Sequence, residues 1–106
     1  MALYRPNVVD AIGTEIETGV IVLSVLNEIG WEEECVLEAL KTKLSAYLAF
    51  IESGELIAEY PAAKDAKLRI EVISRTAISK KAIEFIRRAE QIFMECNCEI
   101  AWRTIP

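Results

Sequence analysis

Residues 20–26, Val-Ile-Val-Leu-Ser-Val-Leu, form an almost unbroken apolar run that is rich in β-branched side chains. Such a run predicts a strand that is either buried on both faces or central in a sheet beneath helices. Upstream, residues 7–12 contain further β-formers, and residues 13–19 are rich in Thr, Glu and Gly, which is typical of a turn. We therefore predict a β-hairpin near the start of the chain.

A long amphipathic helix is predicted directly after this strand. Three glutamates at positions 32–34 fall in its first turn, where the helix dipole favours negative charge. Apolar side chains then recur every three or four residues as far as Ile51, which gives the helix one apolar stripe. Gly54 supplies the stop, because glycine adopts the left-handed conformation without steric cost. Residues 55–60 fit either a short extended piece or a further helical turn.

The second half of the chain predicts a strand, a helix and a last strand. Charged and apolar residues alternate over 67–72 and again over 98–103, as expected for strands with one solvent-exposed face and one buried face. Between them, Ser79 is the expected N-cap of a helix whose apolar stripe ends near Phe93, and Asn97 is a plausible C-terminal cap. Alternation places Trp102 on the buried face of the last strand.

These elements predict an α+β two-layer sandwich in the order β-β-α-β-α-β, with a four-stranded mixed sheet and both helices on one face. Each amphipathic helix needs a sheet face to cover, and covering the same face is the simplest solution. The uncovered face of the sheet would then carry charged residues, namely Arg69, Glu71, Glu99 and Arg103. The strand order does not follow from the pattern.

Length and charge limit the possible function classes. The 106 residues, 53% of them hydrophobic, predict a single domain over residues 1–106 with its own core. The net charge is −5, and residues 1–63 hold 11 acidic against 3 basic residues. This balance disfavours nucleic-acid binding, which needs clustered Lys and Arg. Neither a membrane-spanning run nor a signal-peptide pattern is present, so we expect a cytoplasmic protein.

The residue types that carry most catalytic chemistry are scarce. The chain contains no histidine and three cysteines, of which Cys96 and Cys98 are too close for a zinc knuckle. No glycine-rich phosphate loop is present. Paired acids in the 28–38 region could act in acid/base chemistry or bind a hard cation, but exposure at a helix start, where the helix dipole stabilises acids, is the favoured explanation. We therefore predict no catalytic residue, no cofactor and no metal.

The most distinctive residues predict an interaction surface rather than a reaction centre. Trp31 directly precedes the acidic cluster Glu32, Glu33 and Glu34, and it either anchors a partner or packs over the start of the helix. Phe50 lies off the main apolar stripe of the first helix, and Tyr60 follows that helix closely. We include all six residues in the predicted surface.

The spacing Trp31-Glu32, then Lys43-Leu44, Tyr47, Phe50-Ile51-Glu52-Ser53-Gly54 and Tyr60-Pro61, resembles a small family of bacterial proteins of unknown function. The resemblance runs from about Val9 to the last strand and implies a single domain of this size and a bacterial origin. It implies no reaction.

Three functions are open at this point. A protein-binding or self-associating module is favoured, because short strands leave sheet edges and the acidic half suits a basic partner. A small-molecule-binding domain is the alternative, and an enzyme that uses carboxylates ranks last. The partner would be an unknown protein or a second copy, with no nucleic acid and no membrane.

Overall fold

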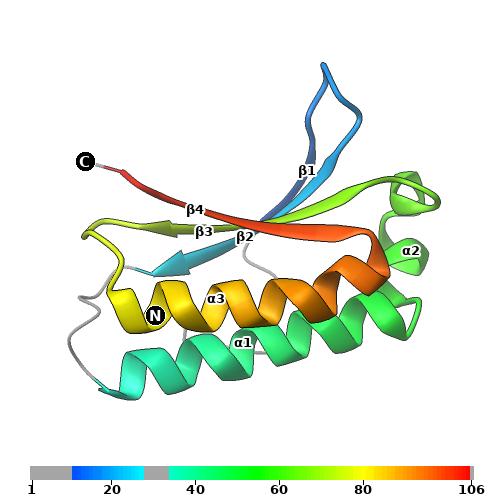
Figure 1. The fold of residues 1–106 in the computed structure, drawn as a ribbon. Helices are drawn as coiled ribbons and strands as arrows, with labels where there is room; N and C mark the ends of the chain where they lie inside the picture. Colours follow the sequence, from blue (N-terminus) through cyan, green and yellow to red (C-terminus); the bar gives the residue numbers. More distant parts are fainter. Residues whose placement is uncertain (1–10, 28–33, 106) are drawn as a thin grey trace.

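A four-stranded mixed sheet forms one layer of the computed structural model, which describes residues 11–27 and 34–105 (Figure 1). The strands are β1 (Ala11–Thr14), β2 (Ile21–Asn27), β3 (Leu68–Ser74) and β4 (Cys98–Thr104), and they lie in this order across the sheet. β1 is antiparallel to β2, whereas β2, β3 and β4 run parallel. The apolar run at 20–26 therefore belongs to an interior strand.

Two helices form the second layer and cover one face of this sheet, as Figure 1 shows. α1 (Glu34–Glu52) links β2 to β3, and α3 (Lys80–Phe93) links β3 to β4. The connections also contain α2 (Glu55–Glu59), η2 (Pro61–Ala63) and η3 (Met94–Cys96). The predicted α+β class and the order of the main elements are confirmed, and the helical alternative is right for residues 55–59.

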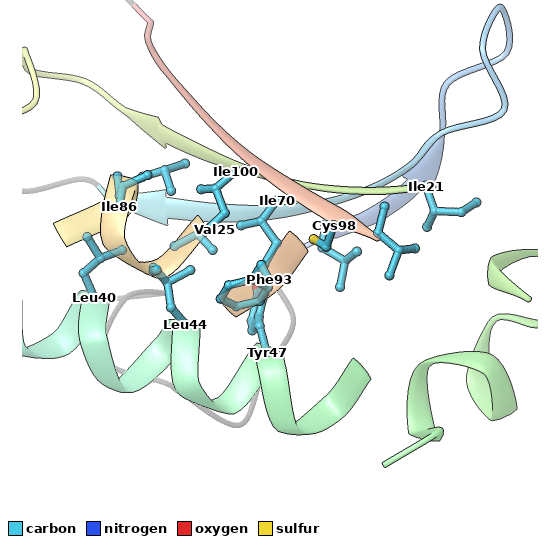
Figure 2. Packing of buried hydrophobic residues seen from close by; sticks show 14 of the residues in the cluster. Ile21, Val25, Leu40, Leu44, Tyr47, Ile70, Ile86, Phe93, Cys98 and Ile100 are labelled. Carbon is cyan, nitrogen blue, oxygen red and sulfur yellow. The ribbon is translucent and has the colours of Figure 1, made fainter. Parts of the chain in front are cut away.

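The core lies between the two layers because strand and helix periodicities bring apolar side chains to the same side. In β2, alternate residues from Ile21 onward are buried, while the residues between them are half-buried. Figure 2 shows Val25 and Ile70 of the sheet and Leu40 of α1 in the space between sheet and helices, and Ile86 of α3 belongs to the same core cluster. All four are fully buried. Each such burial contributes roughly 1.5–3 kcal/mol.

A side-chain hydrogen bond links α1 to the sheet. The Tyr47 hydroxyl of α1 donates to the Ser24 carbonyl of β2 at 2.8 Å. This bond satisfies the hydroxyl of a side chain that is otherwise buried among apolar groups. At the other end of the sheet, Trp102 is half-buried and packs against the core, which agrees with its predicted direction.

The helical segments begin or end at the predicted capping residues. The Ser79 hydroxyl accepts a hydrogen bond from the Ala82 amide at 3.2 Å, as an N-cap does. Gly54 has a φ of 87° and Asn97 a φ of 57°, so both take the left-handed conformation that ends a helical segment.

The first strand ends later than predicted. Of the predicted range 7–12, residues 7–10 lie outside the described part of the chain, and β1 begins at Ala11. It continues through Gly13 and Thr14, which the sequence pattern places in the turn. These two residues pair with Val22 and Ile21, so the ladder of the hairpin overrides their weak strand propensity.

Candidate interaction surface

The turn between β1 and β2 projects beyond the body of the sheet (Figure 1). Its backbone is closed by two hydrogen bonds of 2.8 Å, from the Glu15 amide to the Val20 carbonyl and from the Gly19 amide to the Glu15 carbonyl. Gly19 has a φ of 76°, which a residue with a side chain adopts only with strain. We call residues 15–19 the hairpin tip.

Side chains tie the hairpin tip to the sheet. The Thr18 hydroxyl donates to one carboxylate oxygen of Glu15 at 2.9 Å, and Arg69 of β3 donates to the other at 2.9 Å. The same guanidinium donates through Nε to Glu99 of β4 at 2.8 Å. The side chain of Arg69 is only 22% exposed. Its guanidinium group therefore links the hairpin tip to β4 through two well-ordered, charge-assisted hydrogen bonds.

This network keeps its carboxylates ionised. The Arg69 hydrogen bond, helped by that of Thr18, holds the pKa of Glu15 below the ordinary value of 4.5. The hydrogen bond from Arg69 likewise lowers the pKa of Glu99. The two carboxylates in turn raise the pKa of Arg69. The links between the tip and the sheet are therefore charge-assisted at neutral pH.

Ile16 lies in the hairpin tip with 96% of its surface exposed. It is flanked by Glu15 and Glu17, and Glu17 has no ion pair within the described residues. Single exposed apolar residues are common, but this one sits on a turn whose backbone and side chains are tied down. The tip therefore presents one apolar anchor beside one unpaired carboxylate.

The edge of the sheet at β4 is partly blocked. The outward-facing Ile100 amide donates to the Glu90 carboxylate of α3 at 3.1 Å. A side chain in this place takes the hydrogen bond that an added strand would need, which is one way in which proteins protect sheet edges. On the open face nearby, Arg103 of β4 forms an ion pair with Glu71 of β3.

Three polar residues are buried in the described part of the chain, and two of them lie at the carboxyl ends of parallel strands. Asn27 and Ser74 end β2 and β3 as a paired position, and their exposed fractions are 1% and 2%. Lys43 of α1 is fully buried, and its Nζ lies 5.7 Å from the centre of the Tyr47 ring. The ring face stabilises the ammonium group. Open α/β sheets often bind ligands at this edge, but here the groups are enclosed.

The cysteines that the structure describes are poorly suited to nucleophilic chemistry. Cys96 and Cys98 are both free thiols. Burial raises the pKa of Cys98 to about 12, and burial with nearby acids also raises the pKa of Cys96. Neither thiol therefore supplies much thiolate at neutral pH. Within residues 11–27 and 34–105, no cluster of three metal-ligating side chains is formed.

The residues of the predicted surface do not come together as one site. Trp31, Glu32 and Glu33 lie outside the described residues, and Glu34 is the first residue of α1. Phe50 is half-buried against the core, about 24 Å along the helix from Glu34. Tyr60 lies beside the hairpin, where its hydroxyl and that of Thr14 are 2.7 Å apart and share a hydrogen bond.

Sequence reasoning missed one exposed residue and one buried residue. Ile16 was treated as part of a turn, although a lone apolar residue between two glutamates in a turn is a usable signal of an exposed anchor. The burial of Lys43 does not follow from the sequence. Lys43 occupies a position of the apolar stripe, and the pattern does not indicate whether the ammonium group of a lysine in this position is buried.

The whole chain, residues 1–106, matches the family of unknown function DUF6572, and the protein belongs to this family. The resemblance predicted from the spacing of its aromatic and glycine residues is thereby confirmed as membership of a family of unknown function. Comparison with curated proteins and with solved structures gave no match. Among the described residues, no helix has the length and apolar character needed to cross a membrane.

Proposed function

We propose that this chain is a non-catalytic protein-binding module of the bacterial cytoplasm and that the hairpin tip is its contact element. The observation that carries the proposal is the full exposure of Ile16 on a turn held by Arg69. An isoleucine in this position stabilises nothing in the free protein. Burying it on a partner would contribute roughly 1.5–3 kcal/mol, and the ordered turn lowers the entropic cost of doing so.

The chemistry of the tip defines the partner surface that would suit it. Ile16 needs an apolar pocket, and the carboxylate of Glu17 favours a Lys or Arg at the border of that pocket. The net charge of −5 would speed the approach of a basic partner. Two free thiols agree with a reducing compartment.

A second copy of this chain is a less favoured partner. Antiparallel pairing of two β4 edges would require the Ile100 amide, which already donates to Glu90. Opening that contact would leave the carboxylate without its donor, so the edge is protected against strand addition. An enzyme is less favoured still, because burial suppresses the nucleophilicity of Cys98.

Ile16→Ser should weaken partner capture about ten-fold without affecting the fold. We expect at least one protein from a lysate of the source organism to be retained about ten-fold less by Ile16→Ser than by the unmodified protein, since roughly 1.4 kcal/mol is lost. Quantitative mass spectrometry of the retained proteins measures this. Thermal unfolding should be nearly unchanged, because the side chain of Ile16 is almost fully exposed.

Ile57→Ser is the matched control, since it makes the same change at another exposed isoleucine, on α2. It should retain the same proteins as the unmodified chain. Equal capture of partner proteins by the unmodified chain, Ile16→Ser and Ile57→Ser would show that the hairpin tip is not the contact element. Sedimentation equilibrium of the unmodified protein then establishes whether the partner is a second copy.

A further inference from the structure

A groove runs between α1 and α3 on the side of the helices that faces away from the sheet. Residues of α1, including Lys41, Ser45 and Leu48, form one wall, and residues of α3, including Arg88 and Ile92, form the other. Its volume is about 390 Å³. Cavities of roughly 300–1,000 Å³ are typical of sites for small molecules. The hairpin tip lies on the opposite side of the sheet from these helices (Figure 1).

The groove has a cationic end and an apolar end. The Lys41 Nζ lies 5.7 Å from the centre of the Phe85 ring, which places these two residues at the same level on the neighbouring helices. Leu48 and Ile92 each follow by seven residues, so they lie about 10 Å further along the parallel helices. A ligand lying along the groove would therefore meet positive charge first and apolar surface afterwards.

The positive charge at this end is largely uncompensated. Arg88 has no ion pair with any residue that the structure describes. Among the described residues, Lys41 forms an ion pair with Glu38, at 3.4 Å, and this exposed pair holds its ammonium group weakly. The hydroxyl of Ser45 lines the same wall and can donate a hydrogen bond. In a chain of net charge −5, two cations beside an apolar groove favour an anionic ligand.

We propose that this groove binds an amphiphilic carboxylate, a small molecule with one carboxylate and an unbranched apolar body. The carboxylate lies between Lys41 and Arg88, and the apolar body lies along Leu48 and Ile92. The volume and the length of about 10 Å suit a short alkyl chain rather than a helix of another protein. This site is separate from the hairpin tip, so neither proposal depends on the other.

Titration with octanoate, followed by amide chemical shifts in two-dimensional NMR, tests the proposal. Octanoate should shift amides of the groove-lining turns of α1 and α3 and leave those of the hairpin tip unchanged. Octanol, which lacks the charge, should bind at least three-fold more weakly, and octylamine more weakly still. Equal binding of octanoate and octylamine would overturn the proposal, as would shifts confined to other surfaces or no shift at all.

Three variants locate the ligand within the groove. Arg88→Gln should weaken octanoate binding three- to five-fold or more, whereas Arg87→Gln removes the same charge one residue away, outside the groove, and should leave binding unchanged. Ile92→Glu puts a carboxylate at the apolar end and should abolish binding. Ile92 is 55% exposed, so the fold should tolerate this change. Equal effects of Arg88→Gln and Arg87→Gln would contradict a specific carboxylate contact.

Discussion

Replacing Ile70 with alanine is expected to lower the free energy of unfolding by about 2–5 kcal/mol, which is a large share of the stability of a domain of this size. Ile70 lies on the interior strand β3, points toward both helices and is fully buried (Figure 2). The loss combines the apolar area no longer removed from water with the cavity left between sheet and helices. Urea unfolding followed by circular dichroism measures it.

Val22→Ala on β2 is the comparison from the other face of the same sheet. Val22 is half-buried on the uncovered face, opposite Arg69 in the strand register, so its truncation should cost about 1 kcal/mol or less. A cost for Val22→Ala as large as that for Ile70→Ala would mean that both faces of the sheet are covered equally.

Cys98 should be alkylated at least a hundred-fold more slowly in the folded protein than in the unfolded chain. Burial raises its pKa from 9.0 to about 12, so the reactive thiolate is about a thousand-fold scarcer at neutral pH. The thiol is also only 2% exposed. Iodoacetamide labelling followed by mass spectrometry of the peptides resolves each cysteine.

Cys96 provides the internal comparison, because it lies two residues away and is half-buried. It should be labelled before Cys98 in the folded protein, and both should react at similar rates in urea. Labelling of Cys98 as fast as Cys96 without denaturant would contradict the enclosed position of its side chain at the start of β4.

Periodicity predicted the main elements because each has one apolar face. The predicted strand at 98–103 and the observed Cys98–Thr104 differ by one residue, and Ser79 caps its helix as expected. The strand order could not be predicted, because alternation records which face is buried and not which strand lies alongside. The additional residues of β1 likewise depend on the register with β2, which is a tertiary property.

The interaction surface was harder to predict than the fold. The predicted surface consists of aromatic and acidic residues. Aromatic residues are found in the core, and acidic residues on solvated helix faces, as often as either type is found at an interface with a partner. Phe50 packs against the core, for example, whereas Tyr60 supports the hairpin through Thr14. The importance of Ile16 depends on Arg69, which lies 53 residues further along the sequence and fixes the turn from a neighbouring strand. No local pattern contains that contact.

The order of the hairpin tip in solution is the most direct test of its role as a pre-formed contact element. Backbone ¹⁵N relaxation should give residues 15–19 order parameters near 0.85, like those of β2, and Arg69→Met should lower them while leaving the rest of the sheet ordered. Values below about 0.6 in the unmodified protein would mean that Ile16 is carried on a flexible loop, and the proposed contact element would then be wrong.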